Sequence, residues 1–248
     1  MLLQYALVFG LGLLPSVIWL IFFELEESKH LRPFQDILFA FIVGSITTFA
    51  ALVVQMGVMK LMPLWGISPH DGTGVSIFAF IEEILKFAAV YFLISRRKSF
   101  KEPLDAMIFM ITVALGFAAV ENIASLLNQG GLAAVITSAK SVEVVVLRFL
   151  GATLLHSVTA GIIGFHWAIG WVRKRYVWLH ILVGIVIAGL LHSIFNYLIL
   201  TTGPASWALA YVATIAFFVL VDFEELRSEE EAEEAAGMIF TGPPDAFH

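Results

Sequence analysis

Seven apolar segments, each long enough to cross a bilayer as a helix, constrain the fold of this 248-residue chain more than any other feature. They cover residues 2–23, 35–59, 75–94, 105–127, 144–171, 177–200 and 204–221. The mean hydropathy is +0.92 and 60% of the residues are hydrophobic, which is far above a soluble domain. We therefore predict an all-α, polytopic transmembrane helix bundle in the cell membrane, over residues 1–221. Residues 222–248 are expected to form an acidic, partly disordered cytoplasmic tail.

Basic residues gather in alternate loops, and this asymmetry predicts the orientation of the bundle. One side carries ten of them: Lys29, Arg32, Arg96, Arg97, Lys98, Lys101, Arg173, Lys174, Arg175 and Arg227. The other side carries two, Lys60 and Lys140. Because cytoplasmic loops hold the excess of Lys and Arg, we expect the N-terminus outside and the C-terminus inside. No basic stripe points to nucleic acid, and the absence of cysteine excludes disulfides, thiolate metal sites and a cysteine nucleophile.

The third segment, residues 75–94, carries three charged residues in its interior: Glu82, Glu83 and Lys86. A charge at this depth costs at least about 2.5–3.5 kcal/mol on insertion scales, so all three groups need partners. Lys86 can reach Glu82 at i,i+4 or Glu83 at i,i+3, which leaves one carboxylate unpaired within the helix. A purely structural ion-pair brace needs only one carboxylate, so we expect the pair of glutamates to be functional.

Polar side chains also interrupt the fourth, fifth and sixth segments. They are Glu121, Asn122, Arg148, His156, His192 and Asn196. With a rise of about 1.5 Å per residue and the predicted orientation, these groups and the third-segment charges lie about 6–18 Å below the outer surface. Convergence of four helices on one layer predicts a shared hydrated site in the outer half of the membrane. Structural alternatives are an interhelical pair of Glu121 with Arg148, and histidines that are hydrogen-bonded core residues.

Four short motifs in these segments follow the order found in a known family. They are EEILK (Glu82–Lys86), FAAVEN (Phe117–Asn122), Arg148 followed eight residues later by His156, and HSIFN (His192–Asn196). In these motifs the chain resembles the PrsW family of intramembrane endopeptidases, which shares a superfamily with the type II CAAX-prenyl endopeptidases. The resemblance implies hydrolysis of peptide bonds in membrane-embedded proteins near the outer face. It suggests single-span regulatory proteins, such as membrane-bound anti-sigma factors, as the substrates in the lipid bilayer.

For the chemistry, we expect Glu82 to act as general base toward a water molecule, with help from a histidine, foremost His156. Glu83 would be held by Lys86. His192 and Asn196 lie one helical turn apart and would donate hydrogen bonds to the developing oxyanion. The remaining site residues are Glu121, which would orient water or a histidine, and the supporting residues Asn122 and Arg148. This mechanism needs no cofactor.

Two alternatives remain open. In a metal-dependent protease, His156, His192 and Glu121 would bind a divalent metal such as zinc, and the metal would activate the water. In a transporter, the same polar layer would relay protons or a solute. The layer lies off-centre and the two halves of the chain show no repeat, so we favour the protease.

Overall fold

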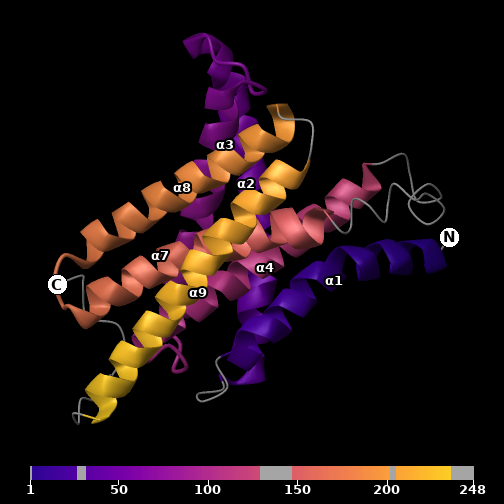
Figure 1. Cartoon of the computed structure of the whole chain (residues 1–248). Coiled ribbons are helices and arrows are strands. Elements are labelled where there is room, and N and C mark those ends of the chain that lie inside the picture. Colours follow the sequence, from indigo (N-terminus) through magenta and orange to yellow (C-terminus); the bar gives the residue numbers. More distant parts are fainter. Residues whose placement is uncertain (1, 27–31, 129–146, 202–204, 236–248) are drawn as a thin grey trace.

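The computed structural model describes residues 2–26, 32–128, 147–201 and 205–235, and these ranges form helices without a strand (Figure 1). The long α-helices are α1 (Leu2–Glu26), α2 (Phe34–Leu61), α3 (Gly72–Ala89), α4 (Pro103–Leu127), α7 (Leu154–Val172), α8 (Val177–Thr201) and α9 (Ala205–Ala235). Three short turns extend them: the 3₁₀ turn η1 (Met62–Trp65) and the π-helical turns η2 (Val90–Ile94) and η3 (Arg148–Thr153). The predicted all-α bundle is confirmed.

Six helices among the described residues are long and apolar enough to cross a membrane, namely α1, α2, α4, α7, α8 and α9. α3 and η2 together form the remaining predicted segment, which is set apart by the three charges in its interior. The polytopic membrane architecture is therefore confirmed. α9 continues beyond the expected last apolar residue, Val221, as far as Ala235, so part of the acidic tail is helical. Residues 236–248 lie outside the described residues.

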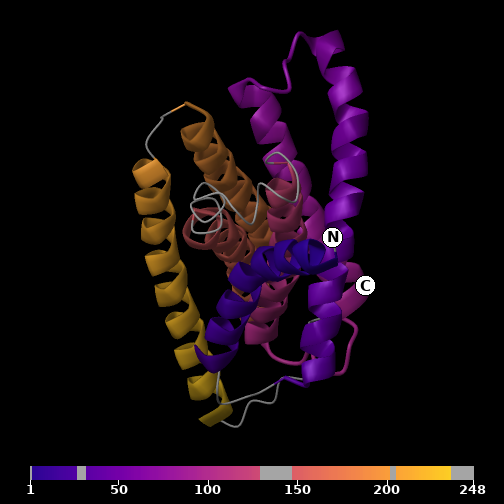
Figure 2. The ribbon, with the colours of Figure 1, turned by 90° about the vertical axis from the view of Figure 1, so that its right-hand side faces the viewer.

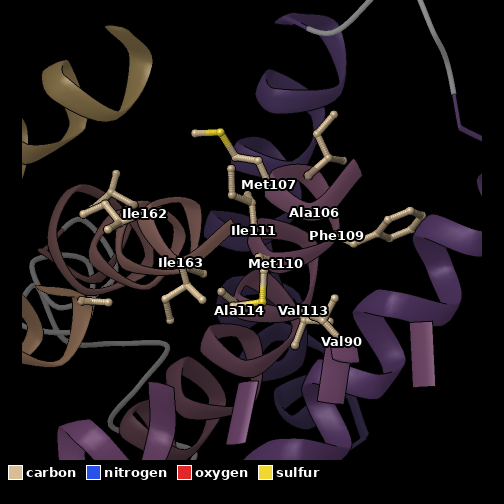
Figure 3. Packing of buried hydrophobic residues seen from close by; sticks show 14 of the residues in the cluster. Val90, Ala106, Met107, Phe109, Met110, Ile111, Val113, Ala114, Ile162 and Ile163 are labelled. Atoms are coloured by element: carbon tan, nitrogen blue, oxygen red, sulfur yellow. The ribbon is translucent and has the colours of Figure 1, made fainter. Parts of the chain in front are cut away.

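α4 is the central helix of the bundle. All its residues from Pro103 to Ala119 are buried, and the helix packs against α1, α2 and α7. Figure 3 shows part of the apolar core, where Met107 and Ile111 of α4 lie near Ile162 and Ile163 of α7. α4 is thus surrounded by other helices rather than by lipid. Polar side chains near a central helix of this kind can find hydrogen-bond partners on the neighbouring helices, which a peripheral helix facing lipid cannot offer.

Small residues bring the helices that frame the site close together. A Cβ atom added at Gly116 of α4 would clash with the carbonyl oxygen of Phe41 in α2. A Cβ atom at Gly164 of α7 would clash with the backbone of Met107 in α4. Thr48 adds a hydrogen bond from α2 to the carbonyl oxygen of Phe117, at 3.2 Å. These close approaches fix the positions of α2 and α7 along α4.

α3 begins at a well-formed N-cap outside its apolar stretch. The Asp71 carboxylate accepts hydrogen bonds from the amides of Gly74, at 2.7 Å, and Ser68, at 3.0 Å. These donors stabilise the ionised form and lower the pKa of Asp71 below its ordinary value. From this cap α3 runs along α8 and α2, and the end of the α2–α3 pair reaches beyond the other helices (Figure 2).

Candidate active site

Glu83 is the centre of a buried hydrogen-bond cluster that joins three helices. Its Oε1 atom accepts from Lys86 Nζ at 2.8 Å, from His192 Nδ1 at 2.8 Å and from Thr159 Oγ1 at 3.2 Å. The side chains of Glu83 and Lys86 are completely buried. The ion pair of Lys86 thus forms at the i,i+3 spacing, and a histidine from α8 and a threonine from α7 complete it. Additional hydrogen bonds of this kind support a buried ion pair, and here all three fall on Oε1, while Oε2 of Glu83 is buried without a hydrogen-bond partner among the described residues.

Lys86 also determines how His156 is protonated. Its ammonium group lies 2.8 Å from His156 Nδ1 and 4.7 Å from the centroid of the Phe117 ring. An ammonium group can only donate, so Nδ1 accepts and a neutral ring carries its proton on Nε2. His156 Nε2 lies 2.7 Å from Glu121 Oε2 and therefore donates to it. A continuous chain of polar contacts results, from Glu83 through Lys86 and His156 to Glu121.

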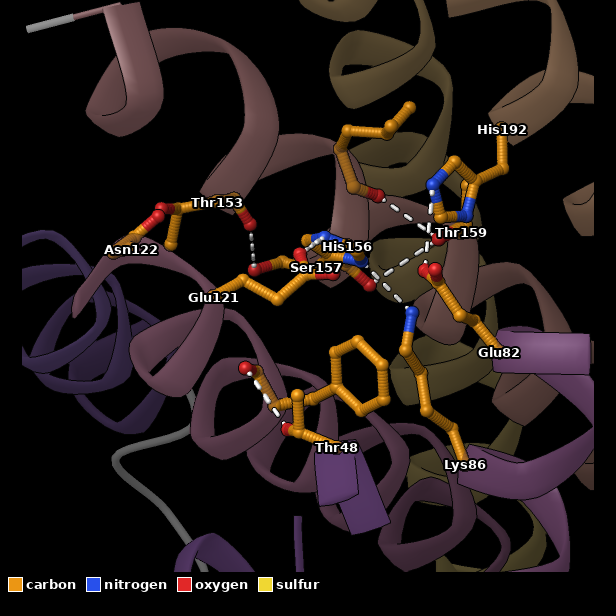
Figure 4. Close-up of polar contacts among 12 residues, drawn as sticks. Thr48, Glu82, Lys86, Glu121, Asn122, Thr153, His156, Ser157, Thr159 and His192 are labelled. Carbon is orange, nitrogen blue, oxygen red and sulfur yellow. Dashed lines mark hydrogen bonds and ion pairs between the residues drawn. The ribbon is translucent and has the colours of Figure 1, made fainter. Parts of the chain in front are cut away.

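The two carboxylate oxygens of Glu82 have different surroundings. Oε1 accepts a hydrogen bond of 2.9 Å from Gln55 Nε2 of α2. Oε2 is buried and has no hydrogen-bond partner among the described residues. In the described part of the chain, the cationic or histidine nitrogen that lies within 4 Å of Oε2 is His192 Nε2, at 3.7 Å. Because His192 Nδ1 donates to Glu83, the neutral ring presents a lone pair at Nε2 toward Glu82. Figure 4 shows Glu82, Lys86, His156 and His192 converging from α3, α7 and α8.

A cavity of about 600 Å³ opens beside this cluster, between the C-terminal part of α4, the N-terminal part of α7 and the C-terminal part of α8. Its wall includes carboxylates, imidazoles and amides: Glu82, Glu121, Asn128, His156, His192 and Asn196. Apolar residues of α7 and α8, such as Leu155 and Phe195, complete the lining. The cavity can therefore hold water and a short peptide segment against the acidic and imidazole groups.

The structure brings most of the predicted site residues together. Glu82, Glu83, Lys86, Glu121, His156 and His192 form one cluster, and Asn196 lies in the cavity wall one turn beyond His192. Asn122 instead points at η3 and donates to Thr153 Oγ1 at 3.0 Å, so it links α4 to the turn that precedes α7. The side chain of Arg148, the alternative partner of Glu121, lies outside the described part of the chain.

A metal-ligand set is also present, with a composition that differs from the expected one. Glu82, His156 and His192 each offer a ligand atom, and these atoms lie within 4.8 Å of one another. The expected carboxylate was Glu121, but its Oε2 atom is in contact with His156 Nε2. The donor set suits a divalent ion, because Glu82 Oε2 has no partner and His192 is oriented by Glu83 through its other nitrogen.

Two residues of the cluster, Gln55 and Thr159, were not predicted from the sequence. Gln55 is the single amide in the apolar run 49–59, and a polar residue isolated in this way indicates a buried polar contact that could have been predicted from the sequence. Thr159 gives no such signal, because a helical threonine usually satisfies its hydroxyl on its own helix. It does so here as well, with the carbonyl oxygen of Leu155 at 3.0 Å.

Comparison with known proteins identifies the family. The family described as "PrsW family intramembrane metalloprotease" matches residues 32–222. The chain is 30% identical to Protease PrsW of Geobacillus kaustophilus (strain HTA426), over 76% of this chain and 78% of that protein. It is 25% identical to Protease PrsW of Bacillus subtilis (strain 168), over 91% of this chain and 95% of that protein. No solved structure matches it. The chain therefore belongs to the PrsW family and is a multi-pass intramembrane protease of the cell membrane.

Proposed function

We propose that the protease cleaves single-span regulatory membrane proteins, of the anti-sigma-factor type, near the extracytoplasmic face, with a water molecule activated by Glu82. The observation that carries the proposal is Glu82 Oε2, which is buried without a hydrogen-bond partner among the described residues beside a cavity of about 600 Å³. A buried polar atom without a partner is unfavourable, so a bound water or substrate group would complete its hydrogen bonding. Water at this position would be the nucleophile.

The size of the cavity supports an unwound substrate. An α-helix with its side chains is about 10–12 Å across, which is too wide for a polar cavity of about 600 Å³ between three helices. The substrate would therefore enter as a short extended segment, with its carbonyl groups exposed to the polar wall. Single-span proteins fit this requirement, because one helix end can unwind without disturbing a bundle.

Glu82 and His192 would share the proton transfers. Glu82 Oε2 would take a proton from the water as it attacks the carbonyl carbon, and His192 Nε2, 3.7 Å away, would accept it next. The protonated ring then donates to the leaving amine, which completes hydrolysis. Asn196 can donate a hydrogen bond to the developing oxyanion whatever the protonation state of His192. His192 can donate to the oxyanion only when its ring is doubly protonated, because Nδ1–H of the neutral ring already donates to Glu83.

The buried chain of Glu83, Lys86, His156 and Glu121 would hold this machinery in place. Glu83 orients His192 through Nδ1, as the carboxylates behind catalytic histidines do. Lys86 keeps the proton of His156 on Nε2, so His156 and Glu121 form a fixed pair at the edge of the cavity. Glu121 is half-buried and can orient the attacking water from this position.

A cleavage assay tests this function. Purified protein in lipid nanodiscs is mixed with a panel of single-span proteins that carry tags at both ends, and the product masses locate the cut. We expect cleavage in the outer part of the transmembrane segment and none in polytopic controls. Cuts restricted to water-soluble domains, or to the inner part of the segment, would contradict the proposal.

A metal-dependent mechanism is the second candidate, favoured by the grouping of Glu82, His156 and His192. These three residues would hold the ion, and a bound divalent metal supplies Lewis-acid polarisation and an acidified water. Glu83 would keep the His192 ring in the orientation that metal binding needs. His156 would have to exchange its contact with Glu121 and release the Nε2 proton that the Lys86 contact favours. This rearrangement makes the metal mechanism less favourable than water activation by Glu82.

Elemental analysis separates the two mechanisms. We expect that chelator-washed protein keeps its activity and contains no stoichiometric transition metal. One metal ion per chain, lost together with activity in His192→Ala, would establish the metal mechanism instead.

A further inference from the structure

Gln55 is a polar residue in an apolar, lipid-facing stretch of α2. Its neighbours Leu52, Val53 and Met56 are 52%, 70% and 49% exposed, as expected for the lipid-facing side of α2. Within an apolar medium, an amide without a partner is strongly unfavourable. Gln55 is half-buried, and its amide is directed at α3 rather than at lipid.

The amide of Gln55 distinguishes the two oxygens of Glu82. Nε2 donates to Oε1 at 2.9 Å, and the carbonyl oxygen of Phe78 lies 3.5 Å from the same nitrogen. Oε2 has no partner among the described residues and is the oxygen next to His192 Nε2, at 3.7 Å. With Oε1 held, rotation of the carboxylate is restricted and Oε2 is kept toward His192.

We propose that Gln55 is a positioning residue for the proteolytic reaction, acting through its hydrogen bond to Glu82 Oε1. The inference rests on the proposed role of Glu82 as the residue that activates water. Gln55 does not line the cavity, so it acts on the carboxylate and not on the substrate. Partners of this kind, which orient a catalytic group from behind, typically contribute about 10–100-fold to activity.

A purely structural role would have different consequences. α2 is already attached to the bundle through the close approach of Gly116 to Phe41 and the hydrogen bond from Thr48 to the Phe117 carbonyl oxygen. Loss of the Gln55 amide should therefore leave α2 in place. A structural contact would affect stability, whereas a positioning contact affects the turnover number.

The test compares Gln55→Met, which keeps the length of the side chain and removes the donor, with Met56→Leu on the lipid-facing side as control. The probe is a single-span fusion protein with a fluorescent domain at each end, chosen from the panel that the wild-type enzyme cleaves. For Gln55→Met we expect kcat to fall about 10–100-fold, with KM and the thermal midpoint close to those of wild type. Gln55→Glu should lose more, because it places a second carboxylate against Oε1. Met56→Leu should behave as wild type.

A double mutant shows whether Gln55 acts through Glu82. In the Glu82→Gln background, Gln55→Met should cause no further loss of the residual turnover, since the two residues form one unit. The inference is overturned if Gln55→Met keeps wild-type kcat while Glu82→Gln is inactive, or if its effect is confined to KM or to stability. Full activity of Glu82→Gln would instead overturn the proposed function itself, so the two failures are distinguishable.

Discussion

Replacement of Lys86 by methionine should destabilise the protein strongly, because it removes the cation from a site that solvent does not reach. Lys86 and Glu83 are both fully buried, with Nζ and Oε1 2.8 Å apart. At an effective dielectric constant of about 20, this separation corresponds to an attraction of about 6 kcal/mol. Thr159 and His192 remain as donors to Glu83, so we expect a net loss of about 3–5 kcal/mol in the free energy of unfolding.

The assay is reversible unfolding in mixed detergent micelles, with Lys86→Met, Glu83→Gln and the double mutant compared with wild type. The double mutant should recover part of the loss, because it leaves no uncompensated charge in the interior. Methionine preserves the volume of the lysine side chain, which limits any effect of a cavity. A loss below about 1 kcal/mol in Lys86→Met would refute the buried ion pair as a structural element.

Three further predictions concern orientation, packing and pH. A reporter fused after Phe223 should be cytoplasmic and one inserted in 61–74 external; the reverse would move the site to the inner half of the membrane. Gly116→Ala should lower the free energy of unfolding by about 1–3 kcal/mol through its clash with the α2 backbone, whereas Gly57→Ala meets no atom within 4 Å and serves as the matched control. Because the pKa of Asp71 is lowered by its amide donors, its stabilisation of α3 is present at neutral pH and lost as the pH falls through that pKa. Asp71→Asn keeps the cap without the charge, so thermal melts at neutral and acidic pH should show wild type losing more stability than this variant.

The fold and most of the cluster could be predicted from the sequence, because the transfer of a polar group into lipid is unfavourable. This keeps the spans apolar and forces the few charged residues within them to contact polar partners. Glu82, Glu83 and Lys86 had to find partners on other spans, and counting residues along those spans was enough to expect Glu121, His156 and His192 at a similar depth. The i,i+3 and i,i+4 spacings left open which carboxylate Lys86 would take. Glu83, which the expected mechanism places next to Lys86, is the carboxylate that Lys86 contacts in the structure. His192 and Thr159 converge on the same oxygen.

Other features depend on tertiary contacts that cannot be predicted from the pattern of residues in one sequence. The proximity of Lys86 to His156 Nδ1 requires the relative rotation of α3 and α7, which periodicity alone does not give. The orientation of Asn122 toward Thr153 depends in the same way on how α4 faces η3. The π-helical turns Val90–Ile94 and Arg148–Thr153 have no sequence signature, and they change which side chains face the core.

The most direct test of the central claim is the single-turnover rate of Glu82→Gln on a cleavable single-span substrate. Glutamine has nearly the same shape as glutamate and offers no base, so we expect a fall of about 10²–10⁴-fold with unchanged folding and membrane insertion. If the variant keeps more than about a tenth of the wild-type rate, then Glu82 has only a structural role, and the account of water activation at its Oε2 atom is wrong.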